Sequence, residues 1–527
     1  MGMITKVHRW GRPALFLVLL LGNLGTTGCD DPNDPKTWAK KLDSLRTRKE
    51  ALDNLARMEP EKARVALPQL RALFEETKDP NHLRAIARLQ DSSTEDLFVA
   101  QLAYDSDDFE NALVAAGFLG DMKAKSATAA LAKAVDKTLP IKSRANQVRL
   151  AAIKALAHIG DPAATPSLTK VLTTSADEQD FLLNKTAALA LAEIKDPAAI
   201  PALLQGLFMT GRGSNVFQEC RLALVRIGAP SVAPLVALLT GKNEDVNKMA
   251  KALKFDEYSP GVVPWKAAWV LGDLRAEQSV SALLAILERP KAGPEHAEAL
   301  LSLGKIGTPK AVDALLDVLR DGKRDWQLRA AASSGLFMAG ATRAVPALFE
   351  VAKSGYVTID GEKASNLRAS AAVDFARLAG KDQYDAFKEL FEKETEAQGV
   401  FGEALDRMQV ARECDADLAC YGKALSDPSP ARAEKAAIAI GLSGDASKGI
   451  PLLLAALKPV KTLQQDHFVA HHAMLLALAR LAQAPCKECT TKLEEQIEAD
   501  RSAVRLPGAV QQLGESQVTL ALIENRK

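Results

Sequence analysis

The sequence predicts an all-α protein, a right-handed superhelical solenoid of about 13 antiparallel helix pairs. The first observation is a repeated segment, since Ala155–Leu168 (ALAHIGDPAATPSL) returns 35 residues later as Ala190–Leu203 (ALAEIKDPAAIPAL). A period in the thirties is typical of arrays in which each unit buries its apolar face against its neighbours. The second observation is composition, because 47% of the 527 residues are hydrophobic and only 5% are aromatic. Ala- and Leu-rich helices that pack closely have this composition.

Each repeat contains two helices and a tight turn. Ala152, Leu156 and Ile159 recur at helical spacing in one first helix. Gly160 then ends that helix, because glycine adopts the left-handed C-cap conformation at little steric cost. Pro166 suits the first turn of the second helix, where its missing N–H is harmless. The positions equivalent to Gly160 form a ladder at 59, 90, 123, 160, 195, 228, 275, 307, 340, 380, 409, 444 and 482.

These repeats resemble the HEAT-repeat family (armadillo-type), in particular the short bacterial HEAT-like units written roughly A-x-x-A-L-G-x-I-G-D-P-x-A-V-P-A-L. The resemblance implies a binding surface rather than a catalytic centre. In several such units an Arg before the first helix pairs with the Asp of the turn. We therefore expect Arg149, Arg329 and Arg368 to pair with Asp161 or Asp196, the alternative being ordinary solvated charge.

The N-terminus is predicted to be a targeting segment outside the fold. Lys6, Arg9 and Arg12 precede the apolar run Ala14–Leu21. That run is too short for a transmembrane helix, which needs about 20 apolar residues. Cys29 follows small residues, and the arrangement resembles the lipobox of bacterial lipoproteins. The resemblance implies that Cys29 is lipidated, and plain secretion is the alternative.

We expect this organisation to place the protein in the bacterial cell envelope, lipid-anchored to a membrane and facing the periplasm or the exterior. The chain is close to neutral, with 67 basic and 66 acidic residues, so no nucleic-acid partner is expected. The predicted divisions are a signal peptide (1–29), a tether (30–36) and the solenoid (37–527). Within the solenoid we expect weaker repeats (37–135), strong repeats (145–380), Cys-stapled repeats (395–500) and a capping helix (505–527).

Two cysteine pairs lie close to ladder positions near the C-terminus. Cys414 and Cys420 follow position 409, and Cys486 and Cys489 follow position 482. In an exported chain, paired cysteines indicate disulfides. A redox CxxC at the second pair and a zinc site built from all four remain open alternatives. Cys220 heads an apolar helix and is predicted to be a buried thiol.

Other chemistry is sparse. His467 and His471, spaced i and i+4, could hold a metal on a helix, although a solvated histidine face is favoured. The sequence contains no phosphate-binding loop, nucleophile elbow or spaced carboxylate pair. We therefore predict no enzymatic activity, no cofactor and no resident metal. Some HEAT-like proteins resemble phycobilin lyases, and this leaves a lyase or ligand-binding protein as an alternative class.

Binding is expected at irregular connections between repeats, where insertions gather on one edge of a solenoid. The longest stretches the ladder spacing from about 35 to 47 residues between positions 228 and 275. It carries Phe255, Tyr258, Trp265 and Trp269, and aromatic anchors are favoured at binding hot spots. We predict that Phe255, Tyr258 and Trp265 contact a protein or peptide partner, whereas Trp269 packs in the core. A structural spacer without a specific partner is the alternative.

Overall fold

The structure is a computed structural model that describes residues 31–138, 142–211, 213–291, 293–354, 357–359, 362–364, 366–500 and 507–526. The chain forms two compact bodies, Met1–Asp91 and Ser92–Lys527. Within the described ranges no single helix is long and apolar enough to cross a membrane. Phe217–Ile227 and Ala229–Leu239 reach that length and apolarity only together, across a bend of 117°.

The N-terminal body is a short helical stack. Its helices are α1 (Pro35–Lys41), α2 (Arg48–Leu55), α3 (Pro60–Ala63), α4 (Leu67–Thr77) and α5 (Pro80–Arg88). Trp38 is buried and its indole Nε1 donates to the carbonyl oxygen of Pro32 at 2.8 Å. Arg64 Nε donates to the carbonyl oxygen of Leu89 at the end of α5, at 3.1 Å. These contacts hold both ends of the body.

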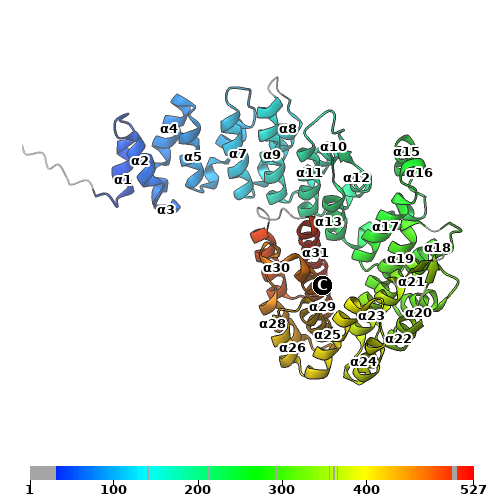
Figure 1. Ribbon diagram of the computed structural model, residues 1–527. Helices are drawn as coiled ribbons and strands as arrows, with labels where there is room; N and C mark the ends of the chain where they lie inside the picture. Colours follow the sequence, from blue (N-terminus) through cyan, green and yellow to red (C-terminus); the bar gives the residue numbers. More distant parts are fainter. Residues whose placement is uncertain are drawn as a thin grey trace, which may run out of the picture. The chain divides into compact units, whose positions relative to one another are not determined.

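The main body is an array of antiparallel helix pairs, as the repeats predict (Figure 1). It begins with α6 (Glu95–Gln101). The first helices are α7 (Phe109–Asp121), α9 (Lys142–Ile159), α11 (Phe181–Ile194), α13 (Phe217–Ile227), α17 (Val262–Asp273), α19 (Pro294–Ile306), α21 (Trp326–Ala339), α23 (Asn366–Leu378), α25 (Gln398–Cys414), α27 (Pro430–Leu442) and α29 (Phe468–Leu481). The second helices are α8 (Thr128–Asp136), α10 (Thr165–Thr173), α12 (Ile200–Gly206), α14 (Val232–Leu239), α18 (Val280–Leu287), α20 (Pro309–Arg320), α22 (Val345–Ser354), α24 (Tyr384–Glu392), α26 (Leu418–Ala424), α28 (Ala446–Ala456) and α30 (Lys487–Asp500). The described residues of the main body therefore hold eleven such pairs.

Two short antiparallel hairpins interrupt the helical array. One pairs β1 (Thr210–Gly211) with β2 (Ser214–Asn215). The other pairs β3 (Val357–Ile359) with β4 (Glu362–Ala364). Both lie in connections between repeats.

The turn inside most repeats depends on one residue with positive φ. Nine of the thirteen ladder positions have φ between 48° and 78°, and five of the nine are glycine. The ladder position at 409 is wrong, because α25 continues through it to Cys414. The left-handed residue of that repeat is Asp415, with φ of 52°. The Gly-Asp-Pro pattern is absent there, so the sequence offered no marker for the end of the helix.

The expected Arg–Asp ladder is wrong, and the structure shows a different one. The Nε atoms of Arg149, Arg329 and Arg368 donate at 2.7–2.9 Å to the carbonyl oxygens of Val135, Leu319 and Ala352. These carbonyls end the second helix of the preceding repeat, where the last turn has no helical donor left. Asp161 and Asp196 instead accept a backbone N–H two residues later, at 3.0 Å. The arginines therefore cap a neighbouring helix, whereas the aspartates shape their own turn.

The C-terminal helix α31 (Pro507–Glu524) does more than cap the last repeat. It packs on α29 and α30, and also on α13, nearly 300 residues earlier in the chain (Figure 1). Lys195 pairs with Glu524 at 3.0 Å, and Asn525 Nδ2 donates to the carbonyl oxygen of Val225 at 2.8 Å. Helices α13 to α31 therefore form a closed array.

Candidate binding surfaces and the charged centre

The long insertion between α14 and α17 projects two short helices, α15 (Glu244–Ala252) and α16 (Phe255–Tyr258). Val246 is fully buried, and the Phe255 ring lies 5.9 Å from the Phe208 ring, so one side of the insertion is held. Its other side is open, with Leu253 50% exposed and Tyr258 68% exposed. Among the aromatic side chains whose burial the structure describes, Tyr258 alone is exposed.

Trp265 does not share this exposed surface. Its ring lies 5.9 Å from that of Trp269, and its Nε1 donates to Glu298 Oε2 at 3.3 Å. Trp269 in turn meets the Phe217 ring edge-on at 5.4 Å. Trp265 is half-buried against α19, so it lies with the interior of the array rather than with Tyr258.

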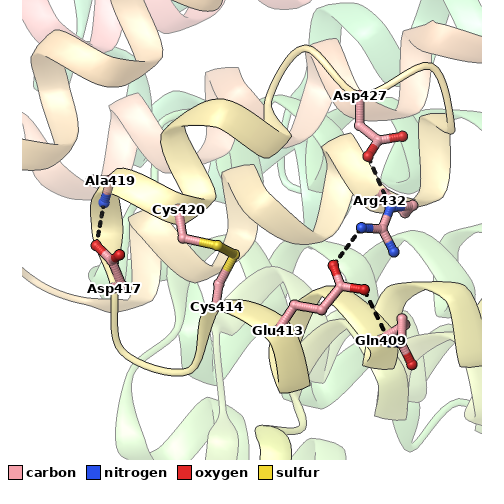
Figure 2. The surroundings of a disulfide bond; sticks show 8 residues. All are labelled: Gln409, Glu413, Cys414, Asp417, Ala419, Cys420, Asp427 and Arg432. Atoms are coloured by element: carbon pink, nitrogen blue, oxygen red, sulfur yellow. Dashed lines mark hydrogen bonds and ion pairs between the residues drawn. A yellow bond between two sulfur atoms is a disulfide. The ribbon is translucent and has the colours of Figure 1, made fainter.

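Each C-terminal cysteine pair bridges the turn of one repeat. Cys414, the last residue of α25, bonds Cys420 in α26, and Asp417 between them accepts the N–H of Ala419 at 2.8 Å (Figure 2). Cys486 bonds Cys489 at the start of α30. In both pairs the Cα atoms are 5.3 Å apart, within the ordinary range for a disulfide.

Arg432 of α27 ties the first disulfide-bearing repeat to the next one. Its guanidinium contacts Glu413 at 2.6 Å and Asp427 at 2.9 Å (Figure 2). Hydrogen bonds from Gln409 and Arg432 lower the pKa of Glu413. The end of α25 is thus fixed by an ion pair on one side and by the disulfide on the other.

A cavity of about 1090 Å³ lies beside this turn. Asp415–Ala419, inside the disulfide loop, form one wall, and Leu378 and Leu442 contribute apolar surface. Lys435 also lines the cavity, and its Nζ donates at 2.6–2.9 Å to three carbonyl oxygens near the end of α23. Burial and the charge of Arg407 lower the pKa of Lys435 to about 7. The ammonium group acts as a cap for α23.

The inner side of the closed array holds buried charges that the sequence reasoning missed. Arg221 of α13 is 1% exposed and contacts Asp273 of α17 at 2.5 Å and Glu515 of α31 at 2.9 Å. Lys305 of α19 contacts Asp273 at 2.7 Å. Burial opposes ionisation of Asp273, but the charges of Arg221 and Lys305 outweigh it and lower its pKa. Four helices therefore meet at one ion network.

A second network lies farther along the inner side. Glu434 of α27 contacts Arg377 of α23 and Arg407 of α25, each at 2.6 Å. Burial by itself would raise the pKa of Glu434, but the two guanidinium groups outweigh burial and lower the pKa, so Glu434 stays ionised. Asp374 accepts hydrogen bonds from Ser333 at 2.7 Å and Arg377 at 2.9 Å, while burial raises its pKa. Successive first helices are joined by charge as well as by apolar packing.

The histidines do not gather into a metal site. His467 is partly exposed and contacts Asp466 at 2.8 Å, whereas His471 Nδ1 lies 3.1 Å from Gln512 Oε1 of α31. Burial lowers the pKa of both His471 and His472. In the part of the chain that the structure describes, no three His, Cys, Asp or Glu side chains are placed to hold a metal ion.

The remaining cysteines differ in what can be said of them. Cys29, the predicted lipidation site, lies outside the described residues. Cys220 is a free and fully buried thiol, and burial raises its pKa well above the ordinary value. A thiol in that state is a poor nucleophile.

The charges of the two networks had a weak signal in the sequence. Arg221 interrupts the apolar run CRLALVRI, and Asp273, Lys305 and Glu434 likewise stand in Ala- and Leu-rich first helices. A charge on such a helix is usually solvated, so the pattern alone does not mark a buried pair. A charged residue recurring on the inner face of several consecutive first helices is the signal that could have been read.

Comparison with known families agrees with this architecture. Residues 95–180 and 256–336 match the family described as HEAT repeats. These two segments of the chain are HEAT repeats. Residues 185–208 match a further family, described as the PBS lyase HEAT-like repeat. No curated protein matches the sequence significantly.

Solved HEAT-type structures resemble the chain only loosely. The CpcE–CpcF complex of phycocyanin lyase from Nostoc sp. is 20% identical over 60% of this chain and 94% of that one, with a TM-score of 0.21. Importin beta is 12% identical over 92% and 72%, with a TM-score of 0.41. Kap121p bound to Nup53p is 13% identical over 89% of this chain and 55% of that one, with a TM-score of 0.47.

Proposed function

We propose that this protein is a membrane-anchored scaffold of the bacterial envelope that binds a protein or peptide partner. The observation that carries the proposal is the insertion between α14 and α17. Among the residues whose burial the structure describes, it alone carries an exposed aromatic side chain, Tyr258, and it also carries the exposed Leu253. Aromatic side chains in such positions dominate binding energy at protein interfaces.

The way the insertion is held supports this role. Val246 and the contact between Phe255 and Phe208 fix the insertion to the array, so binding need not order the segment. A pre-ordered surface loses less conformational entropy when a partner binds. We therefore propose that Phe255 and Tyr258 both serve partner binding. Tyr258 contacts the partner, and Phe255 holds the insertion in place through its contact with Phe208. Trp265 is left out of the contact surface, and lipidation of Cys29 supplies the anchor. No catalytic step is assigned.

The test is cross-linking in intact cells, purification of the chain, and identification by mass spectrometry of the proteins cross-linked to it. The variant Leu253→Ala/Tyr258→Ala should lose a partner that the wild-type chain captures, with recovery falling about tenfold or more. Leu182→Ala is the matched control, because Leu182 is 52% exposed on α11, away from the insertion. The variant Cys29→Ser should move the chain from the membrane to the soluble fraction.

Two outcomes would contradict the proposal. Equal capture by the double variant and by Leu182→Ala would remove the insertion as the binding site. Capture of no reproducible partner would favour the structural spacer. Unchanged fractionation of Cys29→Ser would remove the lipid anchor alone and leave the binding surface standing.

A further inference from the structure

The contact that closes the main body differs in kind from contacts between adjacent repeats. Adjacent first helices pack through small residues, and a Cβ atom on Gly304 of α19 would overlap the backbone of Gly335 of α21. The α31 contact joins helices nearly 300 residues apart in the chain, and it buries the polar side chains of Gln512, Ser516 and Thr519 beside apolar ones such as Val518, Leu520 and Ile523. Contacts between parts of one chain that include buried polar groups resemble transient interfaces more than purely apolar ones do.

Two histidines lie at this closure. His471 and His472 are consecutive residues of α29, the helix that packs against α27 and α31. His471 Nδ1 donates to Gln512 Oε1 at 3.1 Å, and its Nε2 is buried with no hydrogen-bond partner. Protonation of His471 would place a charge and a new N–H donor on that unpaired nitrogen. A buried donor without an acceptor is costly.

The charged groups around the histidines come from every helix packed near them. His472 is influenced by Glu515 of α31, Glu434 of α27, Lys305 of α19 and Arg377 of α23. His471 is influenced by His472 and by Asp500 of α30. The two cations offset the two carboxylates around His472, and each of these groups already has a partner of opposite charge or a backbone donor. None of the three carboxylates named here, Glu515, Glu434 and Asp500, is therefore free to pair with a histidinium.

We propose that α31 is an acid-sensitive latch, released from α13 and α29 when His471 and His472 take up protons. Release exposes the buried imidazole of His471 and opens further that of His472, which is half-buried, so both regain ordinary basicity in the open state. It also frees Glu515 from Arg221, and the inner face of α13 becomes accessible. The latch is independent of the partner surface on the insertion.

The pH window follows from the direction of the shifts. Burial lowers the pKa of both histidines in the closed state, while the open state keeps the ordinary value near 6.5. Below that value the open state binds protons that the closed state excludes, so closure weakens as the pH falls. Each proton taken up changes the opening equilibrium by about tenfold per pH unit. Two histidines give a limit of about a hundredfold per pH unit.

The test is hydrogen–deuterium exchange of the full chain at about pH 7.5, 6.5 and 5.5, corrected for intrinsic exchange. Peptides from α31 should exchange about tenfold faster or more at the lowest pH, while those of α9 and α19 stay unchanged. The variant His471→Gln/His472→Gln should keep α31 protected across the range. His467→Gln is the matched control and should behave as the wild type, because that side chain is partly exposed beside Asp466.

Two results would overturn the latch: no acid-dependent change in α31, or the same change in the double variant. The second would assign release to carboxylates whose pKa is lowered in the closed state, such as Asp273 and Glu434. If the double variant loses helical circular dichroism at neutral pH, His472→Gln alone replaces it. That variant keeps the bond between His471 and Gln512, and it should halve the pH slope.

Discussion

Arg221→Met should be among the most damaging single substitutions in the main body. Arg221 is 1% exposed, and its three nitrogen atoms contact Asp273 at 2.5 Å, Glu515 at 2.9 Å and Gln218 at 2.8 Å. Methionine fills much of the same volume but leaves two carboxylates without this cation. Removing one partner of a buried ion pair costs about 3–5 kcal/mol. The free energy of unfolding should fall by that amount.

The two carboxylates do not suffer equally. Asp273 is 3% exposed and keeps Lys305 at 2.7 Å, whereas Glu515, whose side chain is 14% exposed, is left to solvent. Because Asp273 keeps a cation, the loss in the free energy of unfolding should lie at the lower end of the range, about 3 kcal/mol. The Arg221–Glu515 contact is the one that joins α13 to α31. Glu515→Gln should cost less than Arg221→Met.

Urea unfolding followed by far-ultraviolet circular dichroism measures the effect. The matched control is Arg343→Met, because Arg343 and Asp313 form an ion pair with side chains 52% and 62% exposed. An exposed pair contributes about 0–1 kcal/mol. If Arg221→Met lost no more stability than Arg343→Met, the network would not be holding the helices together and the reasoning would be refuted.

Two further predictions concern the cavity beside α25. Cys414→Ser/Cys420→Ser should lower the free energy of unfolding in urea by about 2 kcal/mol, since the bridge closes a seven-residue loop. A reductant should lower the stability of the wild type by more than this, because it also opens the Cys486–Cys489 bridge. If the reductant does not affect the wild type, neither bridge is formed in solution. Lys435→Met should remove a pH dependence: the pKa of Lys435 is lowered to about 7, so the unfolded chain binds the extra proton from there up to the ordinary lysine value. Wild-type stability should therefore rise relative to Lys435→Met by up to about 1.4 kcal/mol per pH unit between about pH 8 and 10. The control is Lys448→Met, which replaces an exposed lysine that lines the same cavity and should keep the pH dependence of the wild type. If Lys435→Met kept it as well, the assignment to Lys435 would be contradicted.

The repeats could be predicted because each depends on local chemistry. Helical spacing of Ala and Leu, a left-handed residue at the turn and a proline after it act within about 20 residues, so nine ladder positions have the positive φ expected of them. The position at 409 failed because the first helix of that repeat continues to Cys414 and its left-handed residue is Asp415, with no Gly-Asp-Pro pattern to mark the turn. The Arg–Asp ladder failed because the turn aspartates accept N–H groups of their own turns, whereas the arginines lie within reach of helix-end carbonyls that have no helical donor.

The candidate sites divide in the same way. An insertion with aromatic residues is visible as extra length, and the cysteine pairs are visible as close spacing. Which aromatic ring is exposed is decided by packing, so Tyr258 lies open while Trp265 turns to Glu298.

By itself the sequence determined the repeat, its helices and turns, and the place of the insertion, because these follow from neighbours in the chain. Only the tertiary structure decided that α31 returns to α13 and that Arg221, Asp273 and Glu515 meet. Each of these charges, taken alone on a helix, has the pattern of a solvated residue. Their burial depends on the small rotation from one repeat to the next, summed over the array. No local pattern encodes that sum.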